Sequence, residues 1–268
     1  MRLESGKVER IEIDGRPATV DDLRHPALRN YGHFTAMQVR DRRVRGLGLH
    51  LERLDFATRE LFGRELDGEV VRARIRHALA GDVHDASVRV YVFGRDLPTW
   101  GEVEPSVMVT VRPPADPPNP PRNVWPAPYQ RPAAHIKHVG GFGQEYFLRM
   151  AERAGYDEAL LVAPDGTIAE GAITNIGFSD GESIVWPEAP MLRGITLALV
   201  ERGLAEMGIP TRRQVIHLTD LPSLRAAFLT NSRGIMSVQR IGSRRFPVDY
   251  PLMKTLQDAY ERNPWYLI

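Results

Sequence analysis

The feature that most constrains the fold of this 268-residue chain is a proline-rich segment, RPPADPPNPPRN, at residues 112–123. Six of its residues are proline, which lacks a backbone N–H and fixes φ, so the segment cannot continue a helix or a central strand. Prolines in series form a stiff, extended connection instead. We therefore predict two domains, residues 1–111 and 124–268, joined by this linker. The alternative is a long surface loop within one domain.

Composition excludes several classes of protein. The chain has 35 Lys and Arg against 34 Asp and Glu, for a formal net charge of +1, so there is no electrostatic basis for binding nucleic acid or an acidic membrane surface. Hydrophobic residues make up 43% and charged residues 26%, as in globular proteins that build a sizeable core. Cysteine is absent, which excludes disulfides, a thiolate metal site and a cysteine nucleophile.

Targeting and metal signals are also missing from the sequence. The first residues contain no apolar run of signal-peptide length, and no window approaches the roughly 20 apolar residues that span a bilayer. The eight histidines show no HExxH pairing, and no carboxylate cluster has metal-ligand spacing. We expect a cytoplasmic protein that binds no membrane and no metal.

Hydrophobic periodicity predicts helices and short strands in both halves, which is typical of an α+β fold. Glycines at positions 63, 155 and 208 are expected to end helices. The expected helices cover residues 49–61, 69–79, 144–154, 195–207 and 249–261, with a brief helical turn at 221–225. The expected strands cover residues 7–14, 33–39, 87–93, 106–111, 159–163, 167–170, 173–178, 183–186, 212–217, 227–230 and 234–241.

Lysine is rare in this chain, which makes each one informative. Only Lys7, Lys137 and Lys254 occur among the 35 basic residues, so arginine serves wherever a plain surface cation suffices. Lys137 lies in the segment HIKHVGGFG, where a guanidinium could not replace an amine that must lose its proton and attack a carbonyl. The sequence therefore favours Lys137 as a reactive amine, and an ordinary surface lysine is the alternative.

A reactive lysine needs a carbonyl partner, and pyridoxal phosphate supplies an aldehyde, a phosphate and a ring nitrogen. The glycines after Lys137 fit neither a P-loop nor a dinucleotide fingerprint, and no GxSxG elbow is present. Glu170, in TIAEGAITN, is the candidate carboxylate for the ring nitrogen; a surface glutamate at a turn is the alternative. The segment from Gly194 to Thr196 opens a helix that could bind the phosphate. A simple Thr N-terminal cap is the other interpretation there, and Ser232 could add a hydroxyl.

Taken together, these segments resemble the class IV, or fold type IV, pyridoxal-phosphate enzymes. That group contains branched-chain and D-amino-acid aminotransferases, R-selective amine transaminases and aminodeoxychorismate lyase. The resemblance runs from about Tyr31 to Ile241 and is strongest over residues 155–176, with Lys137 upstream and LRGIT at 192–196 downstream. It implies a D-amino-acid aminotransferase-like α+β fold of two domains with the cofactor between them, usually in a homodimer.

The resemblance also implies roles for individual residues. Lys137 matches the Schiff-base lysine and Glu170 the partner of the ring nitrogen. The phosphate ligands it implies are Arg53 in LHLERL, the backbone of Ile195 and Thr196, and Ser232 in the second phosphate loop.

The chain departs from the family pattern at two positions. Arg193 stands where proline is common, and Phe142 lacks the hydroxyl of the tyrosine that branched-chain enzymes place near it, so Tyr146 or water would have to bind the cofactor's phenolic oxygen. Two further residues are candidates for substrate binding. Phe34 lies in FTAMQV, which is similar to a strand of the lyase, and Arg89 could bind a carboxylate or simply face outward from its strand.

The sequence thus predicts an aminotransferase that moves an amino group between a small-molecule amino donor and a keto acceptor through Lys137. A lyase of the same family, which cleaves a carbon–oxygen bond and releases pyruvate, is the first alternative. It is favoured by the Ile-Lys-His triplet at 136–138, but the chain lacks the Asn-Arg pair that usually follows in the lyase. A non-catalytic binding protein that keeps the fold is the second alternative.

Overall fold

The computed structural model describes residues 10–94, 103–116 and 119–268, which form two compact units. The N-terminal unit comprises the described residues from 10 to 115 together with 136–140 and 264–268. The C-terminal unit comprises residues 116–135 and 141–263. The proline-rich segment lies between strands β6 (Pro105–Arg112) and β7 (Arg122–Pro128). Lys7 and the start of the strand expected at 7–14 lie outside the described residues.

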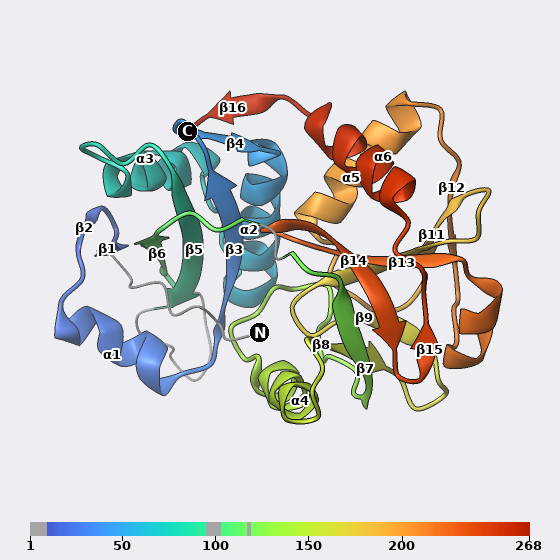
Figure 1. The fold of residues 1–268 in the computed structure, drawn as a ribbon. Helices are drawn as coiled ribbons and strands as arrows, with labels where there is room; N and C mark the ends of the chain where they lie inside the picture. Colours follow the sequence, from blue (N-terminus) through green and yellow to red (C-terminus); the bar gives the residue numbers. More distant parts are fainter. Residues whose placement is uncertain (1–9, 95–102, 117–118) are drawn as a thin grey trace. The chain divides into compact units, whose positions relative to one another are not determined.

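Among its described residues, the N-terminal unit contains a five-stranded antiparallel sheet in the order β2-β1-β6-β5-β3 (Figure 1). The helices and strands predicted from periodicity are confirmed here, and the C-cap of α2 is Gly63. The sheet strands besides β6 are β1 (Arg10–Ile13), β2 (Arg16–Pro17), β3 (Gly32–Val39) and β5 (Ala86–Gly94). The helices are α1 (Val20–Leu28), α2 (Leu47–Phe62) and α3 (Gly68–Ala78), and β4 (Arg43–Arg45) pairs with β16 (Trp265–Leu267).

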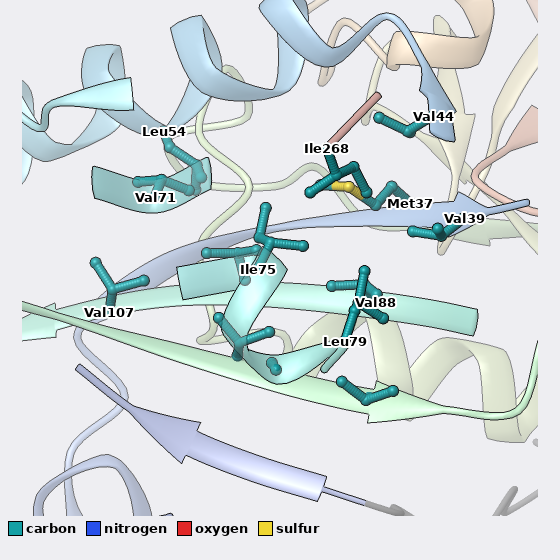
Figure 2. Close-up of a cluster of buried hydrophobic side chains, with 14 of the residues drawn as sticks. Met37, Val39, Val44, Leu54, Val71, Ile75, Leu79, Val88, Val107 and Ile268 are labelled. Carbon is teal, nitrogen blue, oxygen red and sulfur yellow. The ribbon is translucent and has the colours of Figure 1, made fainter. Parts of the chain in front are cut away.

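One face of this sheet forms the core of the unit. Along β3 the buried side chains alternate with partly exposed ones, as a strand with one buried face requires. The buried face packs against α2 and α3 in a cluster that Figure 2 shows, including Met37 from β3, Val88 from β5, Leu54 from α2 and Ile75 from α3. The opposite face carries Phe34 and other partly exposed side chains and lies outside this core.

Two buried hydrogen bonds between histidine and threonine fix α2 on β3. His33 Nε2 lies 3.0 Å from Thr58 Oγ1, and Thr35 Oγ1 lies 2.7 Å from His50 Nδ1. The Thr58 hydroxyl donates to the Leu54 carbonyl oxygen at 2.7 Å, so it accepts from His33, whose Nε2 carries the proton. Because these polar groups are buried, their hydrogen bonds fix both the distance and the register of helix and strand.

The C-terminal unit is built on a larger sheet. Its described strands follow the order β12-β11-β10-β13-β14-β7-β8-β9, with β15 paired to β14. β7 is parallel to both neighbours, and β12 is parallel to β11. The strands besides β7 are β8 (Glu158–Val162), β9 (Ile168–Gly171), β10 (Asn175–Ser179), β11 (Ile184–Pro187), β12 (Thr211–Gln214), β13 (Ala226–Asn231), β14 (Gly234–Ile241) and β15 (Arg244–Arg245).

Three helices and a helical turn accompany this sheet in the described part of the unit. They are α4 (Phe142–Arg153), α5 (Ile195–Glu206) and α6 (Tyr250–Glu261), with a 3-10 turn at Leu218–Ser223. Helices α5 and α6 lie side by side (Figure 1). They cross closely at Gly203, where a Cβ would overlap the Ala259 carbonyl group. Only glycine permits this approach, which fixes α5 in place.

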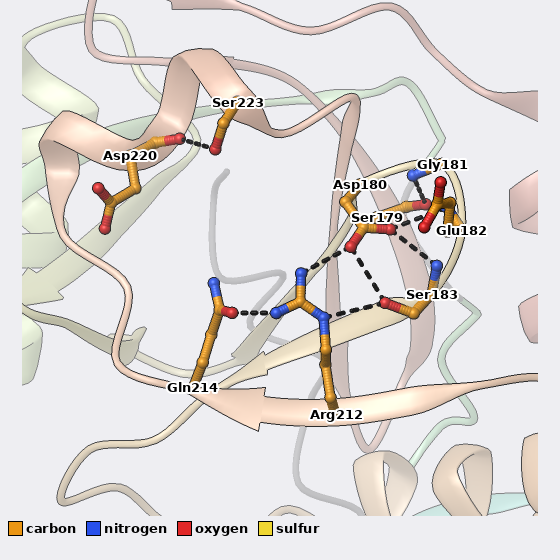
Figure 3. Close-up of polar contacts among 9 residues, drawn as sticks. All are labelled: Ser179, Asp180, Gly181, Glu182, Ser183, Arg212, Gln214, Asp220 and Ser223. Atoms are coloured by element: carbon orange, nitrogen blue, oxygen red, sulfur yellow. Dashed lines mark hydrogen bonds and ion pairs between the residues drawn. The ribbon is translucent and has the colours of Figure 1, made fainter.

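The strand expected at residues 212–217 is shorter in the structure, and this corrects the sequence interpretation. β12 ends at Gln214 because its partner β11 ends at Pro187, opposite Gln214. Arg212 holds this edge to the preceding turn, as Figure 3 shows: its guanidinium donates to Asp180 Oδ2 at 2.6 Å and to Ser183 Oγ at 3.1 Å. The hydrogen bond from Arg212, followed by those from the backbone N–H groups of Ser183 and Glu182, holds the pKa of Asp180 below its usual range.

Strand β7 was not expected from the sequence, because Pro126 and Pro128 lie within it. Its pairing with β14 ends at Val124, whereas its pairing with β8 continues to Pro128. Beyond Val124 the strand therefore has a single sheet neighbour, and proline is tolerated at such an edge. No helix in the described part of the chain is long and apolar enough to cross a membrane.

The buried histidines predict a loss of stability in mild acid. Burial lowers the pKa of His33 to about 4, and burial followed by the charge of Arg53 lowers the pKa of His50 to about 3, from an ordinary value of 6.5. The unfolded chain therefore binds more protons below pH 6.5. Each ring is expected to remove about 1.5 kcal/mol of unfolding free energy as the pH falls from 6.5 to 5.

Urea denaturation at both pH values would measure this loss. The double variant His33→Gln, His50→Asn should lose less free energy of unfolding than the wild type over the same interval. An equal loss in both proteins would contradict the assignment.

Candidate active site

The backbone around Lys137 is fixed on the edge strand of the N-terminal sheet. Phe34 N donates to the Lys137 carbonyl oxygen at 2.9 Å, and Val139 N donates to the Gly32 carbonyl oxygen at 2.9 Å. His33 and His138 form an antiparallel bridge between these two hydrogen bonds. Lys137 therefore extends the sheet beyond β3, and its position along β3 is set by main-chain hydrogen bonds rather than by a mobile loop.

The side chain of Lys137 lies against an aromatic ring on the face of β3 opposite the core. Its Nζ is 4.8 Å from the centre of the Phe34 ring. Phe34 pairs with Tyr91 across β3 and β5, and the two rings stack with centroids 5.2 Å apart. Arg89 Nη1 in turn donates to Tyr91 Oη at 3.3 Å. Three of the predicted residues therefore lie together: Lys137 contacts Phe34, and Tyr91 joins Phe34 to Arg89.

Arg53 lies on α2, and its side chain is half-buried. It follows His50 by three residues, so both side chains emerge from the same side of the helix. The charge of Arg53 contributes to the lowered pKa of His50, after burial. Arg53 is therefore a cation held close to His50 and its buried hydrogen bond to Thr35.

Glu170 is buried on β9 in the C-terminal unit, so the alternative of a surface glutamate at a turn is wrong. Its Oε1 accepts from Arg131 Nη1 at 2.9 Å in a buried ion pair. Its Oε2 accepts from the backbone N–H of Leu192 at 3.2 Å. Both oxygens of the Glu170 carboxylate therefore accept hydrogen bonds, one from a cation and one from a main-chain amide.

Leu192 is held by two side chains of the EGAITN segment. Its N–H donates to Glu170, and its carbonyl oxygen accepts from Asn175 Nδ2 at 2.7 Å. A Cβ at Gly194 would overlap Asn175 Oδ1, so the glycine of LRGIT allows the chain to pass close to Asn175. The two motif segments singled out in the sequence are therefore in direct contact, and together they set the start of α5.

The N-terminus of α5 is tied to the turn between β13 and β14. Thr196 Oγ1 donates to the Asn231 carbonyl oxygen at 2.6 Å, and the N-cap is Gly194. Thr196 is therefore not the N-cap, which corrects the simple capping interpretation. Ser232 follows Asn231 and is exposed in that turn. The first N–H groups of α5 have no partner within the helix. These amides and the Ser232 hydroxyl therefore lie in segments that the hydrogen bond from Thr196 joins.

A second buried carboxylate supports the segment after Glu170. Glu158 Oε1 accepts from its neighbour Ala159 N at 3.0 Å, and Glu158 Oε2 accepts from Thr174 Oγ1 at 3.1 Å. A Cβ at Gly171 would overlap Thr174 Oγ1. Burial raises the pKa of Glu158 to about 7, against the opposing effect of these hydrogen bonds. Glu158 therefore shapes the Gly171–Thr174 turn from within the core.

The two departures from the family pattern lie on the surface. Arg193 Nη2 pairs with Glu201 Oε2 on α5 at 3.3 Å. Phe142 is 81% exposed at the start of α4 and stacks on Tyr146, which is 50% exposed. A phenolic hydroxyl therefore lies one helical turn from the position where the family pattern has a tyrosine.

Sequence reasoning missed Arg131, Tyr91 and Asn175. Arg131 lies in a segment with no periodicity, six residues before Lys137, and nothing in the sequence indicates that it pairs with Glu170. Tyr91 could have been found from the alternation of β5, which puts it on the same face as Arg89. Asn175 belongs to the quoted EGAITN motif, but its role depends on contact with Leu192.

The donor groups fit pyridoxal phosphate by their chemistry. Lys137 offers a primary amine for the aldehyde, and Glu170 offers a buried anion for a protonated ring nitrogen. The α5 N-terminus offers amides for the phosphate. Thr230 adds a buried hydroxyl on β13, for which no hydrogen-bond partner is found in the described part of the chain.

Comparison with known proteins agrees with this chemistry. Residues 32–241 match the model of the amino-transferase class IV family. A probable branched-chain-amino-acid aminotransferase from Synechocystis sp. is 30% identical over 112 residues, which are 41% of this chain and 37% of that protein. The alignment thus spans well under half of that relative's length.

Solved structures share the fold over almost the whole chain. Branched-chain amino acid aminotransferase from Escherichia coli superposes with a TM-score of 0.82 at 19% identity, covering 95% of this chain and 94% of that one. The crystal structure of a putative 4-amino-4-deoxychorismate lyase from Legionella pneumophila superposes with a TM-score of 0.82 at 18% identity, covering 92% of this chain and 96% of that one.

The predicted α+β fold of the fold type IV pyridoxal-phosphate enzymes is thereby confirmed. The chain belongs to the class IV aminotransferase family.

The buried ion pair generates a stability prediction. Replacing Arg131 with Met leaves the Glu170 charge buried without its cation and is expected to lower the unfolding free energy by about 3 kcal/mol. Adding Glu170→Gln removes that charge and should restore much of the loss. Urea denaturation of the single and double variants would measure both.

The exposed pair Arg149–Glu145, with atoms 2.8 Å apart, provides the matched control. Arg149→Met should cost less than about 1 kcal/mol. If Arg149→Met proved as costly as Arg131→Met, burial would not be the cause.

Proposed function

We propose that this protein is a pyridoxal-phosphate-dependent aminotransferase that moves an amino group between an amino acid or amine and a keto acid. The observation that carries the proposal is the buried Glu170 carboxylate, held by Arg131 and the Leu192 amide. Burying an ion pair is costly for a fold that needs only stability. A buried carboxylate fixed in this way suits a cationic ring nitrogen, and the match to the class IV aminotransferase family supports the same chemistry.

When bound, pyridoxal phosphate supplies an aldehyde that exchanges amines and a protonated ring that withdraws electrons. Lys137 Nζ would hold the aldehyde, and as a free amine it would move a proton at the substrate carbon that bears the nitrogen. The main-chain hydrogen bonds to β3 fix where this lysine starts, and the Phe34 ring limits the directions its side chain can take.

Four residues are assigned to the phosphate. Arg53 supplies the cation, the backbone N–H groups of Ile195 and Thr196 donate from the start of α5, and Ser232 adds its hydroxyl. The hydrogen bond from Thr196 to the Asn231 carbonyl oxygen supports this assignment, because it holds the α5 amides close to Ser232. Glu170 would hold the protonated ring nitrogen, and Arg131 fixes the Glu170 carboxylate in place.

The substrates are small molecules, and both the keto acid and an amino-acid donor carry a carboxylate. Arg89 is oriented by Tyr91, which stacks on the Phe34 ring beside Lys137. A guanidinium on the same face as the reactive amine suits an amino acid or a keto acid. A homodimer, which the family resemblance implies, and a cytoplasmic location, expected from the sequence, are part of the same proposal.

A lyase that releases pyruvate is the second candidate. The fold likeness to the Legionella pneumophila structure and the Ile136–His138 triplet favour it. A non-catalytic binding protein is disfavoured, because a binding scaffold has no need for both the anchored Lys137 and the buried Glu170.

Borohydride reduction tests the role of Lys137. The purified protein with pyridoxal phosphate should show an absorbance band near the visible edge, and reduction should attach the cofactor to Lys137. Lys137→Ala should abolish the band and the labelled peptide. Mass spectrometry of the peptides identifies the site.

The two other lysines of the chain, Lys7 and Lys254, serve as controls for Lys137. Lys254 makes an exposed ion pair with Asp258, so Lys254→Ala should keep both band and label. A label on Lys7 or Lys254, or turnover by Lys137→Ala, would sink the proposal.

A second measurement separates transamination from the lyase reaction. The aminotransferase is expected to consume a keto acid for every amino donor converted, because it alternates between two forms of the cofactor. Incubation with a panel of donors and acceptors, followed by assay of each keto acid, measures this ratio. Pyruvate formed without consumption of any keto acid would establish the lyase instead.

A further inference from the structure

Two buried hydrogen bonds join β3 to α2, and a candidate site residue lies between them on each element. Phe34 stands between His33 and Thr35 on β3, and Arg53 stands between His50 and Thr58 on α2. His33 bonds Thr58 at 3.0 Å, and Thr35 bonds His50 at 2.7 Å. His33, Thr35 and Thr58 are wholly buried, and His50 is 4% exposed.

We propose that His50 is a positioning residue that, through its hydrogen bond to Thr35, orients Arg53 to bind the cofactor's phosphate. This inference rests on the proposed function, because Arg53 is assigned to the phosphate there. It adds a residue that touches neither substrate nor cofactor, and a connection from β3 to the phosphate ligand.

Helix geometry separates the two hydrogen bonds. His50 is three residues before Arg53, so their side chains are neighbours on the helix surface. Thr58 is five residues after Arg53, which places it well around the helix at 3.6 residues per turn. The bond from His50 to Thr35 therefore fixes the helix turn from which Arg53 projects. The bond from Thr58 to His33 only packs the helix against the sheet.

The chemistry of His50 suits a place beside a phosphate-binding cation. Burial and the neighbouring charge of Arg53 lower the pKa of His50 to about 3, so the ring is neutral at physiological pH. A neutral ring fixes the helix turn through a hydrogen bond and adds no second cation that would repel Arg53. A lysine or arginine at this position would do the opposite.

The two threonines provide a matched pair of variants. Thr35→Val and Thr58→Val each remove one buried hydroxyl that bonds a histidine, with little change in side-chain volume. The probes are pyridoxal phosphate and pyridoxal, which differ only in the phosphate group. The ratio of their dissociation constants, measured by fluorescence titration, reports what the phosphate contributes to binding and does not require turnover.

Thr35→Val is expected to weaken binding of pyridoxal phosphate about tenfold, equivalent to about 1.4 kcal/mol, and to leave pyridoxal affinity within about twofold. Thr58→Val should leave the ratio unchanged. Thr35→Ser and His50→Asn, which can keep the hydrogen bond, should retain most of the wild-type ratio. In an Arg53→Ala background, Thr35→Val should have no further effect on the ratio, because both changes act through one group.

Failure of this inference differs from failure of the proposed function. Equal weakening of both probes by Thr35→Val, or the same change of ratio in Thr58→Val, would show a general structural role and overturn the inference. If Thr35→Val left the ratio unchanged, the inference would also fail. Wild-type protein that binds neither probe would overturn the proposed function itself, and this inference with it.

Discussion

The C-terminal unit depends on one arrangement of hydrogen bonds around Leu192. Glu170 binds its N–H and Asn175 binds its carbonyl oxygen, so a short sequence motif controls where a distant helix begins. Both contacts are buried, and a lost partner would leave a polar group without compensation. Arg131 then completes the set by pairing with Glu170. The carboxylate that the proposed function assigns to the cofactor's ring nitrogen thus also supports the fold, through contacts to Arg131 and Leu192.

In the N-terminal unit, one face of β3 packs against the core and the other face carries candidate site residues. The residues of β3 that face the core, among them His33 and Thr35, bind α2. Phe34, which lies between them, faces the other way and meets Lys137 and Tyr91. Because successive side chains of a strand point to opposite faces, any shift of β3 along α2 would also move the ring on which the lysine lies. Packing and chemistry are therefore coupled through a single main chain.

Sequence patterns predicted the elements with strong local signals. Helices α2, α4 and α5 combine apolar periodicity with a glycine at or just beyond the end. Helix α1 has a capping box at Thr19 but buries no residue, so its sequence shows no apolar periodicity from which a helix could be predicted. Strand β7 contains Pro126 and Pro128, which argue against a strand when the sequence is considered alone. In the site, motif residues such as Glu170 could be singled out, but Arg131 and Tyr91 act through contacts between segments distant in sequence, which no local pattern encodes.

The path of the chain has a consequence for how this protein could be divided. The proline-rich segment looks like a natural place to cut, yet residues 136–140 belong to the N-terminal unit, as do 264–268. A fragment beginning at residue 124 would carry Lys137 without β3, whose main chain anchors it. The lysine that the proposed function makes reactive would lie in the fragment that lacks its anchoring strand. Recombination at the prolines would therefore yield two polypeptides, neither holding a complete module.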